Sequence, residues 1–295
     1  MSVGLLTSIV CCMDVHEQIH SLFETSTCVD AEDIHWRNVG RILDRLPAGY
    51  QLIHFHRRST FAWGYTDMAA DKIKEAYAFG LRHGANELAH FYDEWATAGS
   101  YDKILSNGGY KGPAAVASIL NRLVEDKTKK ILDIGCGTGL VGEELGKVGF
   151  LNIYAVDPSQ ESLNVCKTKG VYKEFVHSFV GPAQVHFEEN SFDGAVSSGT
   201  FLPGHCDGTS LKELVRLVKP GGVIVITTRK TFYTEKPGEW NWSGTNGPSQ
   251  EKQIDFNYRA ISDELVSSRQ CSLVLEDIPG YSQGVMGLAM IYTVL

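Results

Sequence analysis

Residues 130–139, Lys-Ile-Leu-Asp-Ile-Gly-Cys-Gly-Thr-Gly, decide the fold of this chain. An apolar run predicts a buried parallel strand over 130–134, and a helical pattern follows from residue 139. Between the two stand three glycines at alternate positions, Gly135, Gly137 and Gly139. Such a loop needs glycine because its backbone bends sharply and leaves no Cβ where a ligand lies against it. The stretch therefore predicts a strand, a ligand-binding loop and a helix, with a nucleoside as the ligand.

The glycine spacing and the nearby charge distinguish between nucleoside ligands. The dinucleotide fingerprint is G-x-G-x-x-G and faces a pyrophosphate, whereas the spacing here is G-x-G-x-G. Asp133 precedes the loop, where a carboxylate would repel a pyrophosphate and attract an ammonium or sulfonium cation. A second apolar strand over 152–156 ends in Asp157, where an open α/β sheet places the acid that binds ribose hydroxyls. We therefore expect S-adenosyl-L-methionine as the cofactor; the alternative is a tight turn and a helix-capping aspartate.

These residues resemble the motifs of the class I S-adenosylmethionine-dependent methyltransferases. Residues 133–139 are similar to that family's first motif, Asp157 to its second, and Leu217-Val-Lys-Pro-Gly-Gly222 to the turn into its fifth strand. A narrower resemblance is to the methyltransferase-like proteins named for the Williams-Beuren syndrome chromosome region. It rests on matches at 90–96, 136–141, 219–223 and 227–229. The resemblance implies a methyltransferase domain over 70–295 and leaves 1–69 as an N-terminal extension of unknown role.

Strands and helices are expected to alternate along this domain as in a doubly wound sheet. The expected strands are 130–134, 152–156, 173–178, 193–198 and 222–228. The expected helices are 71–83, 113–124, 139–148, 159–168 and 209–218. By resemblance, 271–276 and 287–294 would add an antiparallel hairpin. The expected fold is α/β: a Rossmann-like, doubly wound, mostly parallel seven-stranded sheet with a C-terminal antiparallel hairpin and an N-terminal helical extension.

The expected cofactor contacts gather at the carboxyl edge of this sheet, where right-handed crossovers place the ends of the parallel strands. In methyltransferases of similar pattern, an aromatic segment shields the sulfonium through cation-π contact worth about 0.5 to 2 kcal/mol. The alternative is a helix that packs these rings on the core. The acid that commonly receives adenine is missing from 176–181, which leaves backbone groups or Ser178. The expected cofactor-binding residues are Tyr92, Trp95, Tyr101, Asp133, Gly135, Cys136, Gly137, Gly139, Asp157, Pro158, Ser178 and Ser198.

Residues 198–205 follow the fourth strand, where a sheet of this type presents groups to the reacting centre. They contain no Asn-Pro-Pro-Tyr-like motif, which argues against methylation of an adenine or amide nitrogen. Similar proteins often carry a Gly-His pair here, so His205 is the candidate catalytic residue, as a general base or a substrate contact. The alternative is a loop histidine bonded to backbone. Arg229 either anchors an anionic group of the acceptor or lies solvated at the rim, and the loop at 240–247 is expected to cover the acceptor.

Composition limits the expected partners. The chain has 295 residues, 43% of them hydrophobic and 21% charged, enough for one α/β domain with an extension. A formal charge of -8 gives no basic stripe for a phosphate backbone, so we expect a small-molecule or protein acceptor and no nucleic acid. The seven cysteines are scattered, which indicates neither a disulfide framework nor a metal site. The apolar run at 3–13 lacks a basic flank and is too short for a bilayer, so we expect a cytoplasmic protein without a membrane anchor. Composition leaves the oligomeric state open.

The N-terminal extension is less informative. Its patterns predict helices at 14–24 and 31–46 and a short strand at 50–56. His16-Glu-Gln-Ile-His20 matches H-E-x-x-H, which on a helix sets two histidines as zinc ligands. We do not expect a metalloprotease, because the pattern fixes only three positions and lies outside the domain.

The sequence thus favours a methyltransferase that uses S-adenosyl-L-methionine and works mainly by aligning its two substrates and excluding water. Two alternatives remain open. One is a catalytically silent protein that binds the same cofactor and serves as an interaction module. The other is a nicotinamide-dependent oxidoreductase.

Overall fold

The structure is a computed structural model that describes residues 72–73, 75–107, 109–181, 185–234, 257–282 and 284–295. The elements predicted within 1–69, the H-E-x-x-H pattern among them, and the loop expected at 240–247 lie outside the described residues. No helix among the described residues is both long and apolar enough to span a bilayer.

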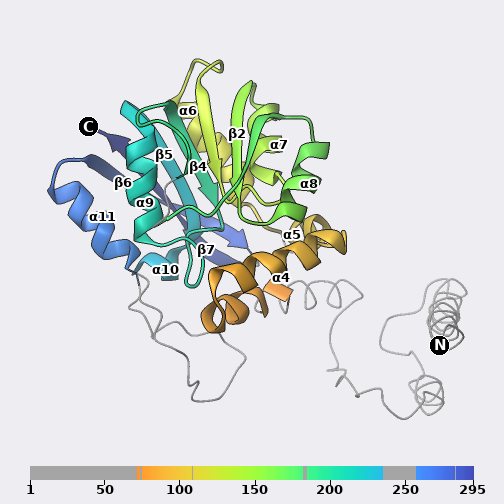
Figure 1. Ribbon diagram of the computed structural model, residues 1–295. Coiled ribbons are helices and arrows are strands. Elements are labelled where there is room, and N and C mark those ends of the chain that lie inside the picture. Colours follow the sequence, from red (N-terminus) through yellow and green to blue (C-terminus); the bar gives the residue numbers. More distant parts are fainter. Residues whose placement is uncertain (1–71, 74, 108, 182–184, 235–256, 283) are drawn as a thin grey trace, which may run out of the picture. The chain divides into compact units, whose positions relative to one another are not determined.

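One sheet organises the described part of the chain (Figure 1). Its strands are β1 (Lys130–Ile134), β2 (Asn152–Asp157), β3 (Tyr172–His177), β4 (Phe192–Ser198), β5 (Val218–Arg229), β6 (Cys271–Ser282) and β7 (Val285–Val294). They lie in the order β3-β2-β1-β4-β5-β7-β6. The first five pair in parallel, whereas β7 pairs antiparallel with both β5 and β6. The predicted fold class is confirmed, and the strand order reverses between β1 and β4, the place where open sheets bind ligands.

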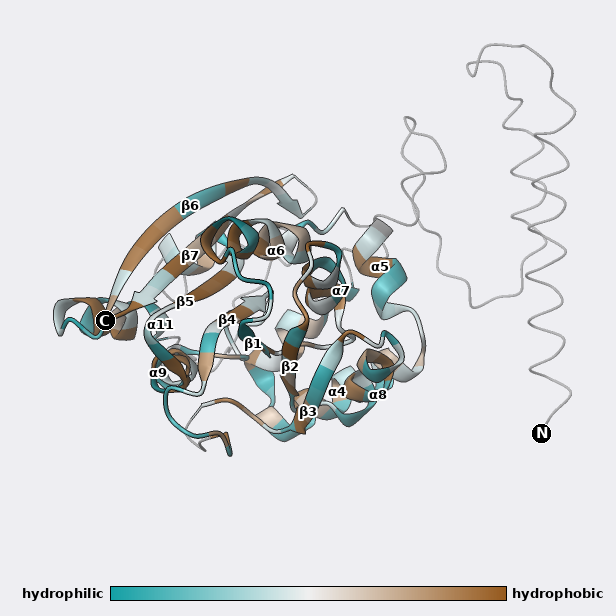
Figure 2. Ribbon diagram, turned by 90° about the horizontal axis from the view of Figure 1, so that it is seen from above, coloured by the Kyte–Doolittle hydropathy of each residue, from teal (hydrophilic) through white to brown (hydrophobic). Residues whose placement is uncertain are grey.

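Helices cover both faces of the sheet (Figure 2). The helices are α4 (Ala85–Thr97), α5 (Tyr101–Asn107), α6 (Gly112–Leu123), α7 (Leu140–Lys147), α8 (Gln160–Thr168), α9 (Gly208–Leu217), α10 (Lys230–Thr234) and α11 (Tyr258–Ser267). Residues of α6, α7 and α8 share one buried apolar cluster, and residues of α9 and α11 share the other. Residues 75–82 form a further helical stretch ahead of α4.

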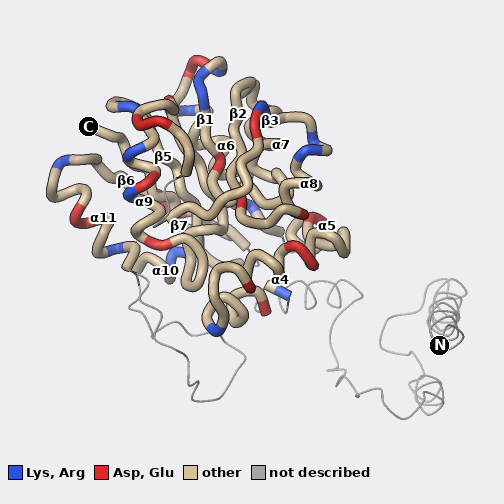
Figure 3. The backbone as a smooth tube through the Cα atoms, viewed as in Figure 1, with Lys and Arg blue, Asp and Glu red and all other residues tan. Residues whose placement is uncertain are grey.

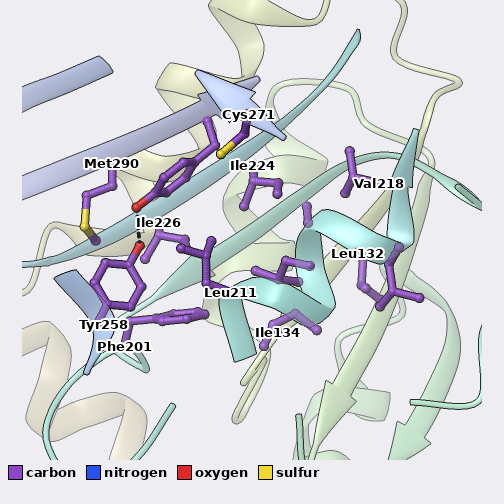
Figure 4. Close-up of a cluster of buried hydrophobic side chains, with 14 of the residues drawn as sticks. Leu132, Ile134, Phe201, Leu211, Val218, Ile224, Ile226, Tyr258, Cys271 and Met290 are labelled. Carbon is purple, nitrogen blue, oxygen red and sulfur yellow. Dashed lines mark hydrogen bonds between the residues drawn. The ribbon is translucent and has the colours of Figure 1, made fainter. Parts of the chain in front are cut away.

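Strand residues alternate between the two clusters, as a sheet covered on both faces requires. On β1, Ile131 faces the α6 side while Leu132 and Ile134 face the α9 side. Figure 4 shows the α9 side, where the strand residues meet Leu211 of α9 and Tyr258 of α11. The hydroxyl of Tyr258 is hydrogen-bonded to that of Tyr292 at 2.8 Å, so both buried hydroxyls have a hydrogen-bond partner.

Three helices begin at the carboxyl edge of the sheet, directly after a parallel strand. Ser159 starts α8 by accepting a hydrogen bond from the Ser162 N–H, and Asp207 starts α9 by accepting one from the Thr209 N–H at 2.8 Å. Helix α7 starts at Gly139, whose φ of 91° is left-handed. The amino ends of these helices therefore face the same edge as the glycine loop.

The predicted elements and the observed ones differ mainly at their ends. Strand β5 begins four residues before the expected 222–228 strand, because Val218 already pairs with Phe192; the register then shifts, and regular pairing with β4 resumes at Val223. The helices α5, α10 and α11 were not predicted; α5 and α10 have only seven and five residues, too few for a helical period to be recognised.

Candidate functional site

A cavity of about 440 Å³ opens at the carboxyl ends of β1, β2 and β4. Its walls come from the glycine loop and the start of α7, the end of β2 and the start of α8, and the 198–210 segment. Helices α4 and α5 supply the remaining wall, including Tyr92 and Tyr101. The cavity thus lies where the strand order reverses, as the sequence predicted.

The three loop glycines have different tasks. All have positive φ, 63° at Gly135, 51° at Gly137 and 91° at Gly139. A Cβ at Gly135 would collide with the Thr200 side chain, and one at Gly139 would lie 2.8 Å from the Cys166 sulfur. At Gly137 the nearest atom is the Tyr101 hydroxyl oxygen at 4.0 Å. Only Gly137 therefore has open space beside it at the cavity. Gly135 and Gly139 are required because a side chain at either position would collide with its neighbours.

Asp157 holds the loop in place from the end of β2. One carboxylate oxygen accepts the Gly137 N–H and the other accepts the Ser159 N–H, each at 2.8 Å. The side chain is 8% exposed, and this burial raises the pKa of Asp157 to about 6. Each oxygen keeps a second lone pair. Asp157 can therefore accept further hydrogen bonds from a ligand in the cavity.

Asp133 does not reach the cavity wall. It is fully buried behind the loop, where it accepts a hydrogen bond from the Tyr172 hydroxyl at 2.6 Å. Tyr172 in turn accepts the Gly142 N–H at 2.9 Å. Burial raises the pKa of Asp133 to about 7, so near neutral pH the group is close to half protonated. The expectation that its charge attracts a cation is therefore corrected: desolvation suppresses that charge, and the side chain positions the loop.

The predicted aromatic cap is divided between two cavities. Tyr92 and Tyr101 line the large one, whereas Trp95 packs behind them, with its ring 4.7 Å from that of Tyr101. Trp95 instead lines a smaller cavity next to the first. Tyr92 and Tyr101 line this smaller cavity as well, so they stand between the two cavities, whereas Trp95 lines only the smaller one.

Two carboxylates anchor this cap to the core. Asp93 of α4 accepts hydrogen bonds from the Ser159 hydroxyl at 2.7 Å and the Glu161 N–H at 3.0 Å, at the first turn of α8. Asp102 of α5 accepts the Thr138 hydroxyl of the glycine loop and forms an ion pair with Lys169 at 2.9 Å. The cap is thus tied to the elements that form the opposite wall.

His205 lines the cavity and is bonded to the cap. Its Nδ1 donates to the Pro203 carbonyl at 3.3 Å, since a carbonyl only accepts. Its Nε2 therefore accepts the Tyr92 hydroxyl proton, at 2.8 Å. Burial lowers the pKa of His205 to about 4. The expected titration near the ordinary value of about 6.5 is thus corrected: His205 is neutral at physiological pH, with its basic nitrogen facing Tyr92.

Of the remaining predicted contacts, Cys136, Pro158 and Ser198 line the cavity and Ser178 does not. The Ser178 hydroxyl donates to the Phe179 carbonyl, and its N–H donates to the Asp157 carbonyl, so both groups bond within the chain. The two residues after it, Phe179 and Val180, form the wall in its place. Their signal in the sequence was an apolar pair directly after a strand end at the carboxyl edge.

Other wall residues escaped prediction because their roles depend on distant partners. Tyr110 lies between α5 and α6, and its hydroxyl is 2.7 Å from that of Ser198. In the sequence, Asp207 only precedes the helix expected at 209–218. With Asp157, it gives the cavity two carboxylates, whereas no Lys or Arg lies among the described residues that line it.

Comparison with known proteins agrees with this geometry. Residues 132–226 match a family model described as "Methyltransferase domain". The chain is 33% identical over 152 residues to Methyltransferase-like protein 27 of Homo sapiens, a match that covers 50% of this chain and 61% of that protein. It is 34% identical over 127 residues to Demethylmenaquinone methyltransferase of Geobacillus stearothermophilus, covering 39% of this chain and 52% of that protein. The chain thus spans less than two thirds of the length of either curated relative.

A solved structure extends the comparison to the fold. A chain in the complex between the Haloferax volcanii Trm112 methyltransferase activator and a methyltransferase gives a TM-score of 0.50 at 16% identity, and the match covers 69% of this chain and 97% of that one. At this identity the likeness concerns the fold alone. Together with the strand order and the glycine loop, these matches show that this chain carries a class I methyltransferase domain, the kind that takes S-adenosyl-L-methionine as its cofactor.

Proposed function

We propose that this protein transfers the activated methyl group of S-adenosyl-L-methionine to a nucleophile on a small-molecule acceptor. The observation that carries the proposal is the cavity beside Gly137, with Asp157 at its wall. Ribose hydroxyls are donors that a two-oxygen carboxylate accepts without losing its backbone bonds. The Geobacillus relative's name states a small-molecule acceptor for that protein, which supports the same class here.

The residues at the wall fit this cofactor. Asp157 would hold the ribose, the backbone of Gly135 to Gly137 the amino acid portion, and Phe179 with Val180 the adenine ring. When bound, the cofactor supplies a methyl group on a positively charged sulfur, which is already a good leaving group. A wall with two carboxylates and no basic side chain among its described residues suits a cationic ligand, whereas the negatively charged pyrophosphate of a dinucleotide would be repelled by the same carboxylates. The charge at the wall therefore disfavours the nicotinamide alternative.

The chain's own groups then have defined tasks. Tyr92 and Tyr101 exclude water from the region next to the glycine loop, so a nucleophile meets the methyl group in a dry site. A nucleophile that must lose a proton can pass it to the Tyr92 oxygen, while Tyr92 passes its own proton to His205 Nε2, 2.8 Å away. Because His205 is neutral at physiological pH, its Nε2 is ready to accept.

Calorimetric titration of the full-length protein tests this proposal. S-adenosylhomocysteine, the product form of the cofactor, should bind at micromolar concentration, and NAD should not bind at millimolar concentration. Binding of NAD without binding of S-adenosylhomocysteine would overturn the proposal. Methyl transfer to a member of an acceptor library, followed by mass spectrometry, then separates an active enzyme from a silent cofactor-binding module.

A further inference from the structure

A second, smaller cavity of about 60 Å³ adjoins the large one. Both are lined by the same six residues, Tyr92, Tyr101, Leu105, Tyr110, Ser198 and Gly199. A molecule in the small cavity would therefore be separated from the large cavity by no more than the width of one side chain. The small cavity has room for only a few non-hydrogen atoms, about the size of one functional group.

The charge in the small cavity is opposite to that in the large one. Arg229, at the carboxyl end of β5, is the charged residue among its described walls, which include no Asp or Glu. The guanidinium lies over the Tyr77 ring, 5.2 Å from its centroid. Among the described residues, no carboxylate forms an ion pair with Arg229, whereas its chain neighbour Lys230 is paired with Asp277. A partly buried guanidinium without a counter-charge favours an anion beside it.

A second donor lines the same cavity independently of the first. The indole N–H of Trp95 is buried, with the residue 4% exposed, and it has no acceptor among the described residues. A buried donor left without an acceptor destabilises the protein, so an acceptor atom on a ligand beside it is favoured. Trp95 and Arg229 come from α4 and β5, so both donors reach this cavity from separate elements.

The remaining walls are flat and aromatic. Tyr110 and Tyr281 meet edge to face with ring centroids 5.3 Å apart. Their hydroxyls are 3.2 Å apart, and that of Tyr281 donates to the Thr227 carbonyl at 3.1 Å. These polar ends are therefore occupied within the protein, and the ring faces and edges suit a planar ligand.

We propose that the small cavity is the acceptor subsite and that it binds the carboxylate of a small planar acceptor through Arg229 and the Trp95 N–H. This inference rests on the proposed function, since the acceptor's nucleophile would then lie on the side of Tyr92 and Ser198, toward the methyl group. It names the substrate class as aromatic or similarly flat carboxylic acids. It also explains why, in the described part of the chain, a guanidinium without a carboxylate partner and an indole N–H without an acceptor lie beside a cavity whose neighbour holds carboxylates.

The test uses benzoate and its neutral analogue benzamide as probes on the full-length protein, with and without saturating S-adenosylhomocysteine. Wild type should bind benzoate roughly tenfold more tightly than benzamide, the effect of one charge-assisted hydrogen-bonded pair. In Arg229→Gln the preference should fall to about threefold or less. Arg259→Gln is the matched control, because Arg259 also lies over a tyrosine, 5.7 Å from the Tyr233 centroid, outside both cavities.

Trp95→Phe is a second variant, which keeps an aromatic ring and removes the N–H. It should weaken the binding of benzoate more than the binding of benzamide. Equal affinity of wild type for the two probes, or a benzoate preference that persists in both variants, would overturn the subsite. The cofactor titration is read separately. If wild type does not bind S-adenosylhomocysteine, the proposed function is refuted. If it binds S-adenosylhomocysteine but shows no preference for benzoate over benzamide, only the acceptor class is refuted.

Discussion

Replacing Asp157 by Asn should change cofactor affinity and protein stability in opposite directions at neutral pH. Burial raises the pKa of Asp157 from its ordinary 3.8 to about 6. A carboxyl group with a higher pKa in the folded protein than in the unfolded chain destabilises the fold once both states are ionised, here by about 3 kcal/mol above pH 6. Below pH 3.8 both states are protonated and this penalty is absent.

Asparagine removes that penalty but also removes one acceptor. Asp157 accepts the N–H groups of Gly137 and Ser159 on separate oxygens, and an amide can serve only one of them. The other N–H then lacks a partner, which costs about 1 to 3 kcal/mol. The free energy of unfolding at pH 7 should therefore stay the same or rise by up to about 2 kcal/mol. Near pH 4 this advantage of the variant should disappear, because the Asp157 carboxyl group is then largely protonated in the folded wild type and, like the amide, keeps only one carbonyl oxygen as a full acceptor.

The affinity for S-adenosylhomocysteine should fall by roughly 10- to 100-fold, since a neutral amide replaces a charged acceptor of ribose hydroxyls. Urea denaturation at pH 7 and pH 4 measures the stability, and calorimetry measures the affinity. Asp277→Asn is the control, because Asp277 is exposed, and neither it nor its partner Lys230 lines the large cavity. A folded Asp157→Asn protein with wild-type affinity would refute the assignment of Asp157 to the cofactor.

Three further changes test other parts of the site. Because burial lowers the pKa of His205 to about 4, turnover by wild type at saturating cofactor should not fall as pH drops from 8 to about 5.5. Saturation is needed because Asp157, with a pKa of about 6, changes the affinity for the cofactor in this range. His205→Asn should lower turnover roughly 10²- to 10⁴-fold while calorimetry shows unchanged cofactor affinity; an inflection near pH 6.5 in the turnover at saturation would contradict the buried state of the ring. Gly135→Ala should unfold at a clearly lower temperature than Gly137→Ala, since only the Cβ at position 135 collides with Thr200. Gly137→Ala should chiefly weaken the binding of S-adenosylhomocysteine. Equal melting temperatures for the two variants would argue against the different roles of these glycines. Removal of residues 1–69 should leave cofactor affinity within about threefold, because every described wall residue lies at or after Ala85; a larger loss in a folded truncated protein would show that the extension contributes to the cavity.

The sequence sufficed where a local pattern determines the structure. The strand that precedes Gly135 and the acid at the end of the next strand follow from short apolar runs and from the geometry of parallel sheets, so β1 and Asp157 lie where they were expected. The same holds for the wall position of Tyr92, which follows from the aromatic stripe on α4.

The rest depends on tertiary contacts that no local pattern encodes. Asp133 and Asp157 were both predicted to contact the cofactor, yet Asp133 is buried with a hydrogen bond from Tyr172, while Asp157 lines the cavity. The lowered pKa of His205 arises from its burial in the folded protein, where its hydrogen-bond partner Tyr92 is 113 residues away in the chain. Trp95 and Tyr92 were predicted to share one ligand, but the turn of α4 assigns Trp95 to the second cavity alone.

The position of Asp93 has a consequence for the kinetics of the bound nucleoside. Its carboxylate caps the first turn of α8 from outside that helix, and Tyr92 beside it is bonded to His205. Helix α4 cannot swing away without breaking the Asp93 hydrogen bonds to Ser159 and Glu161 and freeing the histidine ring at the same moment. Departure of the spent cofactor is therefore coupled to a local unfolding event, and we expect its dissociation rate to follow the stability of this small contact region rather than the affinity of the cavity walls.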